Sequence, residues 1–261
     1  MSPVLLFLIP VGIAVIAALC MFGGALFGMW LQKRLPKHHL DKESHETVKV
    51  GIGVIATVTA LVLGLLVSSA KNTYDTLNTG LVKVSASIIL LDQTLVEYGP
   101  EAQPIRAQLR NNLTATIARL WPGQSTNAPV LASIEKSHGL ENLQIALEQL
   151  TPQTNLQRES LADARQIAGE LMQTRWLLIE QAQTQLPVPF LVVLIFWLTI
   201  IFMSFGLFAP RHGTVIVVMF NCALAMAAAI FLVLELSQPL TGLIRLSSAS
   251  MLDALRHLSQ Q

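Results

Sequence analysis

Charged residues are scarce in this sequence. They make up 13% of the chain, whereas soluble domains average about 25%. The formal net charge is only +1, so no basic surface predicts a nucleic acid partner. Hydrophobic residues account for 52% of the chain. The composition therefore favours an integral membrane protein over a soluble domain.

Cysteines and catalytic motifs are equally scarce. The two cysteines, Cys20 and Cys222, both lie inside apolar segments, which argues against a disulfide framework. The sequence has no GxSxG, P-loop, HExxH or GxGxxG motif. Histidines and carboxylates gather at residues 38–46 without a metal-ligand spacing, so a solvated loop is favoured over a zinc site. We expect no enzyme, no cofactor and no metal.

Long apolar segments are what the sequence does contain. They lie at residues 4–31, 50–67, 188–208 and 215–236. Each approaches or exceeds the roughly 20 residues that a helix needs to cross a bilayer. The first has no basic residues before it, and Lys33 and Arg34 follow it, so a retained helix is favoured over a cleaved signal peptide. The sequence predicts an all-α integral membrane protein with four transmembrane helices.

The polar stretches divide the chain into four parts. We expect a transmembrane hairpin at 1–69, a helical extramembrane domain at 70–186, a second hairpin at 187–236 and an amphipathic tail at 237–261. Apolar spacing predicts that the second segment continues as one helix to Tyr98. Further helices are expected at 101–120, at 130–150 and from Pro152 towards Pro187. The tail, with Leu252, Leu255 and Leu258 as its apolar positions, is expected either on the membrane interface or packed on this domain.

Basic residues favour one orientation. Five of them lie in the short loop at 32–49, and Arg211 lies between the last two segments. By the positive-inside rule, both short loops are cytoplasmic, with the termini and the middle domain outside.

Few polar groups lie within the apolar segments, and no charged residue lies at mid-membrane. This argues against a proton relay or a voltage sensor. An interhelical hydrogen bond is favoured over pore lining for the Asn221 amide, and an interfacial position over a gate for Glu235. The pore-lining candidates are Thr57, Thr59, Ser68, Asn221 and Glu235.

Small residues predict close helix packing. Gly24 and Gly28 form a GxxxG pair, and Ala60 and Gly64 stand at the same spacing in the second segment. We expect a tightly packed bundle and a homo-oligomer.

Several stretches resemble a bacterial membrane protein family that is labelled bestrophin-like and classed as a domain of unknown function. They are LPKHHL at 35–40, VKVGIGVIATVTALVLGLLVSSAKNTYDT at 48–76, ILLDQTLVEYGPEAQPIRAQLRNNL at 89–113, FGLFAPRHGTVIVVMFNCAL at 205–224 and AIFLVLELSQPLTGLIRLSSASMLDAL at 229–255.

The resemblance implies a pentameric anion channel of the bacterial inner membrane whose second helix lines the pore. It also implies a cytosolic middle domain, which is the opposite of the orientation that the charge pattern predicts. It further implies a ring of aromatic residues around the neck of the pore, and the second segment has no aromatic residues to form one. We expect an oligomeric ion channel in contact with the lipid bilayer and small ions. The alternative is a non-conducting scaffold or sensor whose middle domain binds a partner.

Overall fold

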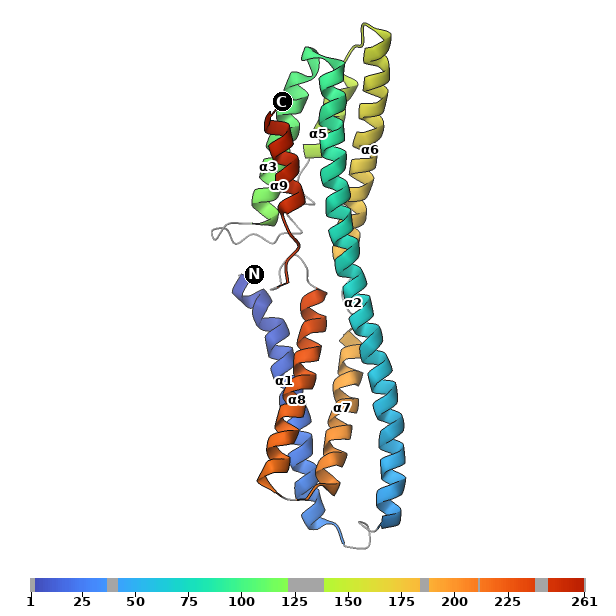
Figure 1. Ribbon diagram of the computed structural model, residues 1–261, viewed down its shortest axis with the longest axis vertical. Helices are drawn as coiled ribbons and strands as arrows, with labels where there is room; N and C mark the ends of the chain where they lie inside the picture. Colours follow the sequence, from blue (N-terminus) through green and yellow to red (C-terminus); the bar gives the residue numbers. More distant parts are fainter. Residues whose placement is uncertain are drawn as a thin grey trace. The chain divides into compact units, whose positions relative to one another are not determined.

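The computed structural model describes residues 3–36, 42–121, 139–183, 188–210, 212–237 and 244–260. Within these ranges the secondary structure is entirely helical (Figure 1). The elements are α1 (Pro3–Arg34), α2 (Lys42–Tyr98), the short 3-10 helix η2 (Pro100–Ala102), α3 (Gln103–Leu120), α5 (Gly139–Glu148), α6 (Asn155–Gln183), α7 (Val188–Phe208), α8 (Gly213–Leu236) and α9 (Ala249–Gln260).

The chain forms two compact units. The membrane unit comprises Val4–Asn72 and Gln185–Gln238, and the extramembrane unit comprises Met1–Pro3, Thr73–Thr184 and Pro239–Gln261. The boundary falls inside α2, which contributes residues to both.

The membrane unit contains the four predicted transmembrane helices. Parts of α1, α2, α7 and α8 are long and apolar enough to cross a bilayer. A helix satisfies its own backbone hydrogen bonds, which hydrocarbon demands of any spanning segment. The core of the unit joins Met21 of α1, Leu194 and Phe202 of α7 and Ile230 of α8. The predicted fold class is confirmed.

The extramembrane unit buries one apolar stripe from each of its helices. In α2 the predicted positions Leu81, Val84, Ile88, Leu91 and Leu95 are all buried. They share one core with residues of α3, α5, α6 and α9, among them Leu109, Leu143, Leu171 and Met251.

Helix α2 runs unbroken for 57 residues and ends at Tyr98, as the sequence predicts. It ends there because Gly99 adopts φ 119°, a backbone conformation open mainly to glycine, and Pro100 follows. The predicted third helix at 130–150 is only partly described: α5 begins at Gly139, and residues 130–138 lie outside the described ranges.

The C-terminal tail packs on the extramembrane unit. Helix α9 lies beside α3 and buries Met251, Ala254 and Leu258. Of the three apolar positions named from the sequence, Leu258 is buried and Leu255 packs against the core, whereas Leu252 is 36% exposed.

Candidate functional site

The membrane-spanning part of α2 has two unlike faces. Thr59 is buried, 3% exposed, on the same side as Val62, Leu63 and Leu66, which pack against the core of the membrane unit. The opposite face is uncovered: Val54 is 61% exposed and Leu61 65% exposed, and Thr57 lies between them. Because successive helical residues are 100° apart, Thr57 and Thr59 point to nearly opposite sides. The two threonine candidates therefore cannot share one pore surface.

Both threonine hydroxyls bond to their own helix. The Thr57 hydroxyl donates to the carbonyl oxygen of Gly53 at 2.8 Å, and the Thr59 hydroxyl donates to that of Ile55 at 2.7 Å. Thr57 in this rotamer presents oxygen lone pairs to the surroundings. Such an oxygen can replace part of the hydration shell of a cation, and the hydroxyl must rotate before it can donate to an anion.

The remaining polar candidates are dispersed. Ser68 lies exposed on the same face of α2 as Thr57. Asn221 is exposed on α8, where its amide donates to the Val217 carbonyl at 2.9 Å. This bond lies one turn back in its own helix, and the interhelical hydrogen bond favoured for Asn221 stays a prediction. Glu235 is only 1% exposed, so the interpretation as a snorkelling residue is wrong.

Glycines bring α1 and α7 into backbone contact. A Cβ atom added at Gly24 would lie 2.9 Å from the Thr199 carbonyl oxygen, and one at Gly28 would overlap the Met203 carbonyl. In the same way, a Cβ atom added at Gly206 of α7 would overlap the Ala25 carbonyl of α1. Ala60 and Gly64, in contrast, lie on the uncovered face of α2, and no atom lies within 4 Å of a Cβ built at Gly64.

A family model described as the bestrophin-like domain matches residues 19–251. The chain belongs to the bestrophin-like family. The resemblance drawn from the sequence is thereby confirmed. Comparison with curated proteins finds no match.

Solved structures share the fold of this bestrophin-like chain. A mutant of a bacterial bestrophin homologue from Klebsiella pneumoniae is 15% identical, with a TM-score of 0.68 and coverage of 96% of this chain and 97% of that one. A second structure of a Klebsiella homologue, phased on zinc, is 14% identical, with a TM-score of 0.64 and coverage of 94% and 97%. At this identity the likeness shows the fold alone.

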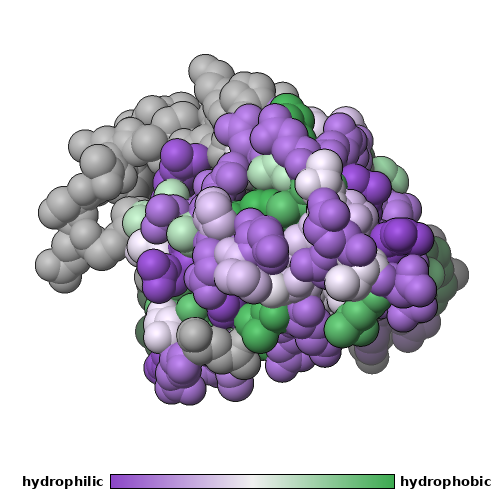
Figure 2. All heavy atoms as spheres, turned by 90° about the horizontal axis from the view of Figure 1, so that it is seen from above, coloured by the Kyte–Doolittle hydropathy of each residue, from purple (hydrophilic) through white to green (hydrophobic). Residues whose placement is uncertain are grey.

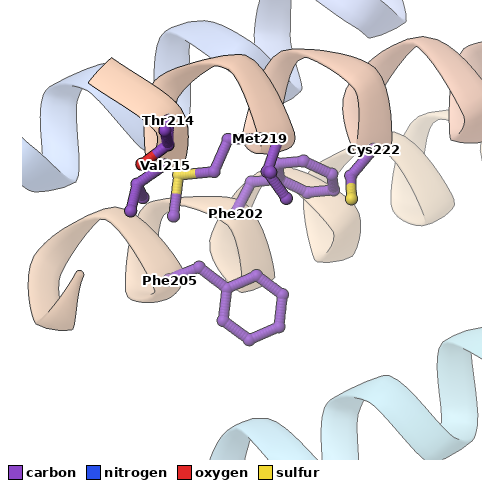
Figure 3. Close-up of a pocket in the computed structure, with 7 residues that line it drawn as sticks. Phe202, Phe205, Thr214, Val215, Met219 and Cys222 are labelled. Atoms are coloured by element: carbon purple, nitrogen blue, oxygen red, sulfur yellow. The ribbon is translucent and has the colours of Figure 1, made fainter. Parts of the chain in front are cut away.

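The membrane unit of this bestrophin-like chain is hollowed between two of its helices. Between α7 and α8 lies an open groove of about 320 Å³. Figure 3 shows Phe202, Phe205, Met219 and Cys222 around it. None of these lining residues is charged, and Thr214 and Cys222 are the polar ones among them.

No metal site is formed by the residues that the structure describes, since no three His, Cys, Asp or Glu side chains among them come together. The His- and carboxylate-containing loop at 38–46 lies largely outside the described side chains.

Sequence reasoning missed an aromatic and basic cluster at the end of α1. Phe27 and Trp30 stack with ring centroids 5.5 Å apart, and the Arg34 guanidinium carbon lies 5.3 Å from the Trp30 ring centroid. Tryptophan and arginine closing an apolar segment at i, i+4 spacing were the available signal.

Proposed function

We propose that this bestrophin-like protein is an oligomeric ion channel of the bacterial inner membrane, with the uncovered face of α2 lining the pore. The supporting observation is the two-faced packing of α2. One side contributes to the core of the membrane unit, while the other leaves Thr57 and Ser68 exposed among Val50, Val54 and Leu61.

In a ring of subunits, the uncovered face of α2 can line a central pore. One membrane unit does not enclose a polar path with its own α2, because the hydroxyls of Thr57 and Ser68 face away from its core. Cyclic symmetry brings the same face of each copy to a common axis. Gly53 and Gly64 beside Thr57 have open space around them, so α2 helices of neighbouring copies can approach closely.

The composition of the face suggests how such a pore conducts. Its hydroxyl groups are separated by valine and leucine side chains. A ring of hydroxyls can replace part of the hydration of an ion, whereas rings of Leu61 and Leu65 repel water when narrow. We therefore expect weak or conditional conduction, governed by wetting of the leucine-lined segment.

Two isosteric substitutions test the pore assignment. Thr57→Val removes a hydroxyl from the uncovered face, and Thr59→Val removes one from the buried face at nearly the same depth. In planar bilayers, we expect purified Thr57→Val protein to show a smaller unitary conductance and Thr59→Val protein to match the wild type. Equal effects of both substitutions, or none from Thr57→Val, would remove α2 from the pore.

The scaffold alternative rests on a different observation. The extramembrane unit exposes large apolar side chains, including Leu90 of α2, Ile145 of α5 and Leu156 of α6, at 51%, 54% and 62%. Figure 2 shows hydrophobic residues as separate spots on a largely hydrophilic face. A partner protein can use such spots as anchors.

The oligomeric state and the electrical activity of one purified preparation distinguish the channel from the scaffold. A strictly monomeric protein in lipid nanodiscs that stays electrically silent across pH, calcium and voltage would favour the scaffold. A closed ring of subunits with unitary currents would favour the channel.

A further inference from the structure

The outer face of α1 ends in a stacked cluster of Phe27, Trp30 and Arg34, here called the interfacial cluster. The Phe27 and Trp30 rings are nearly parallel, with an interplanar angle of 26°. They are 50% and 49% exposed. Met21 and Ala25, which are buried in the core of the membrane unit, lie on the other side of the helix. The cluster therefore faces away from the core of the membrane unit.

The order of the three side chains matches the polarity gradient of a bilayer surface. From Phe27 to Arg34 the helix rises about 10 Å, and the headgroup layer on one side of a bilayer is roughly 5–7 Å thick. An apolar ring, an indole with a polar N–H and a cation follow one another over this distance. The preceding turns of the same face expose Ile16 and Leu19, which suit hydrocarbon.

The positive charge at the end of α1 favours binding of an anion. The Arg34 guanidinium lies over the Trp30 ring, with its carbon 5.3 Å from the ring centroid, and its N–H groups can donate hydrogen bonds to an anion. Among the side chains that the structure describes, Arg34 has no ion-pair partner. The loop at 32–49 carries five basic residues against three acidic ones, so its net charge is positive.

We propose that the interfacial cluster is a docking site for the headgroup of an anionic phospholipid. The lipid phosphate accepts hydrogen bonds from the Arg34 guanidinium, while the Trp30 ring lies at the level of the acyl ester groups. Phe27 contacts the first methylenes of the chains. The site fixes the depth of α1 in the membrane and favours phosphatidylglycerol over phosphatidylcholine.

Trp30 itself serves as the probe. Trp197 lies in the transmembrane helix α7, so Trp197→Phe protein is compared with the Trp30→Phe/Trp197→Phe double variant, and the difference in fluorescence reports Trp30. Both are reconstituted into vesicles whose lipids carry bromine near the carbonyl end of the acyl chain, either as phosphatidylglycerol or as phosphatidylcholine.

We expect brominated phosphatidylglycerol to quench Trp30 more strongly at equal mole fraction, with a relative binding constant of roughly fivefold for the one stacked cation. Arg34→Gln should abolish this preference, and Arg34→Lys should retain it, because the charge remains. Arg175→Gln is the matched control: Arg175 also stacks on a tryptophan, at 5.8 Å from Trp176, but in the extramembrane unit, so the preference should persist.

Each contrary result overturns the proposal. Equal quenching by the two lipids would mean that no headgroup is recognised. No quenching by either would mean that protein covers Trp30, most simply a second copy of the chain. If the Trp197→Phe background fails to fold, the difference between wild type and Trp30→Phe gives the same comparison.

Discussion

One ion pair stands out among the individual residues, and it joins two helices of the extramembrane unit. Asp92 of α2 accepts two hydrogen bonds from Arg106 of α3, at 2.7 Å to Nε and 3.0 Å to the terminal nitrogen. The side chains are only 4% and 10% exposed. The hydrogen bond to Asp92 raises the pKa of Arg106 above its ordinary value, although burial opposes this. A group whose pKa is raised on folding adds stability at every pH below its pKa in the unfolded chain, so this ion pair contributes through neutral and mildly alkaline pH.

We predict that Asp92→Ala lowers the free energy of unfolding by about 3 kcal/mol, because the buried Arg106 charge loses its partner. Asp253→Ala is the control, since the Asp253–Arg256 pair is exposed, at 58% and 71%, and should cost less than about 1 kcal/mol. Denaturant unfolding of the detergent-solubilised protein, followed by circular dichroism, gives both values. Similar small losses in the two variants would contradict the structural role assigned to Asp92.

Glycines of α1 allow a second prediction at this scale. Gly28→Ala places a methyl group against the Met203 backbone and should destabilise the protein by about 1–3 kcal/mol through overpacking. Gly23→Ala meets no atom within 4 Å and should be neutral or stabilising by up to about 1 kcal/mol, because alanine favours helix. Thermal unfolding in detergent distinguishes the two, and a melting temperature lowered equally by both would refute the close contact.

Hydrogen bonds between distant segments hold the helices of the extramembrane unit in place. The Gln157 side chain donates to the Tyr98 carbonyl at 3.1 Å and accepts from the Gln153 backbone at 2.8 Å, which ties the start of α6 to the end of α2. The Trp121 indole donates to the Leu246 carbonyl at 2.8 Å. This bond links the end of α3 to the segment that leads into α9.

The docking of α9 should therefore depend on Trp121. Trp121→Phe removes a hydrogen bond worth about 1 kcal/mol and should speed tryptic cleavage after the exposed Arg245 roughly fivefold. Trp176→Phe is the matched control, because the Trp176 ring is half exposed and stacks only with Arg175 within the described residues. Mass spectrometry of the C-terminal fragment measures the rates. Unchanged cleavage in Trp121→Phe would show that apolar contacts alone hold α9.

Helix α2 shows how far sequence patterns reach at the element scale. Its end at Tyr98 was predictable because Gly99 and Pro100 forbid continuation, and its extramembrane stripe followed from helical spacing. Its uncovered membrane face was not predictable. Residues 50–67 are apolar on all sides, so periodicity could not tell which of Thr57 and Thr59 faces the core. The Trp121 bond was equally hidden, because its partner lies 125 residues away.

For the whole molecule, the apolar composition of the chain was more informative about the fold than any sequence motif. Four apolar segments of about 20 residues each predict four helices, because a helix of this length spans the hydrocarbon and satisfies its own backbone hydrogen bonds. The family match then fixes the fold, but the face that each copy turns to its neighbours depends on an assembly that the sequence of one chain does not encode locally.

The orientation of the membrane unit in the bilayer is a prediction that rests on the distribution of basic residues. Five basic residues lie in the short loop at 32–49, and charges in short loops determine orientation more strongly than those in a long domain. We predict that both short loops face the cytoplasm.

Cysteine labelling tests this orientation. In a background with Cys20 and Cys222 replaced by alanine, His212→Cys reports the α7–α8 connection and Gln173→Cys reports α6; both positions are exposed. An impermeant maleimide should label Gln173→Cys in intact spheroplasts and His212→Cys only in inverted membrane vesicles. The reverse pattern would instead support the cytosolic middle domain that the bestrophin resemblance implies. Labelling of both positions from one side would contradict the four-helix topology, because α7 (Val188–Phe208) must cross the membrane between them.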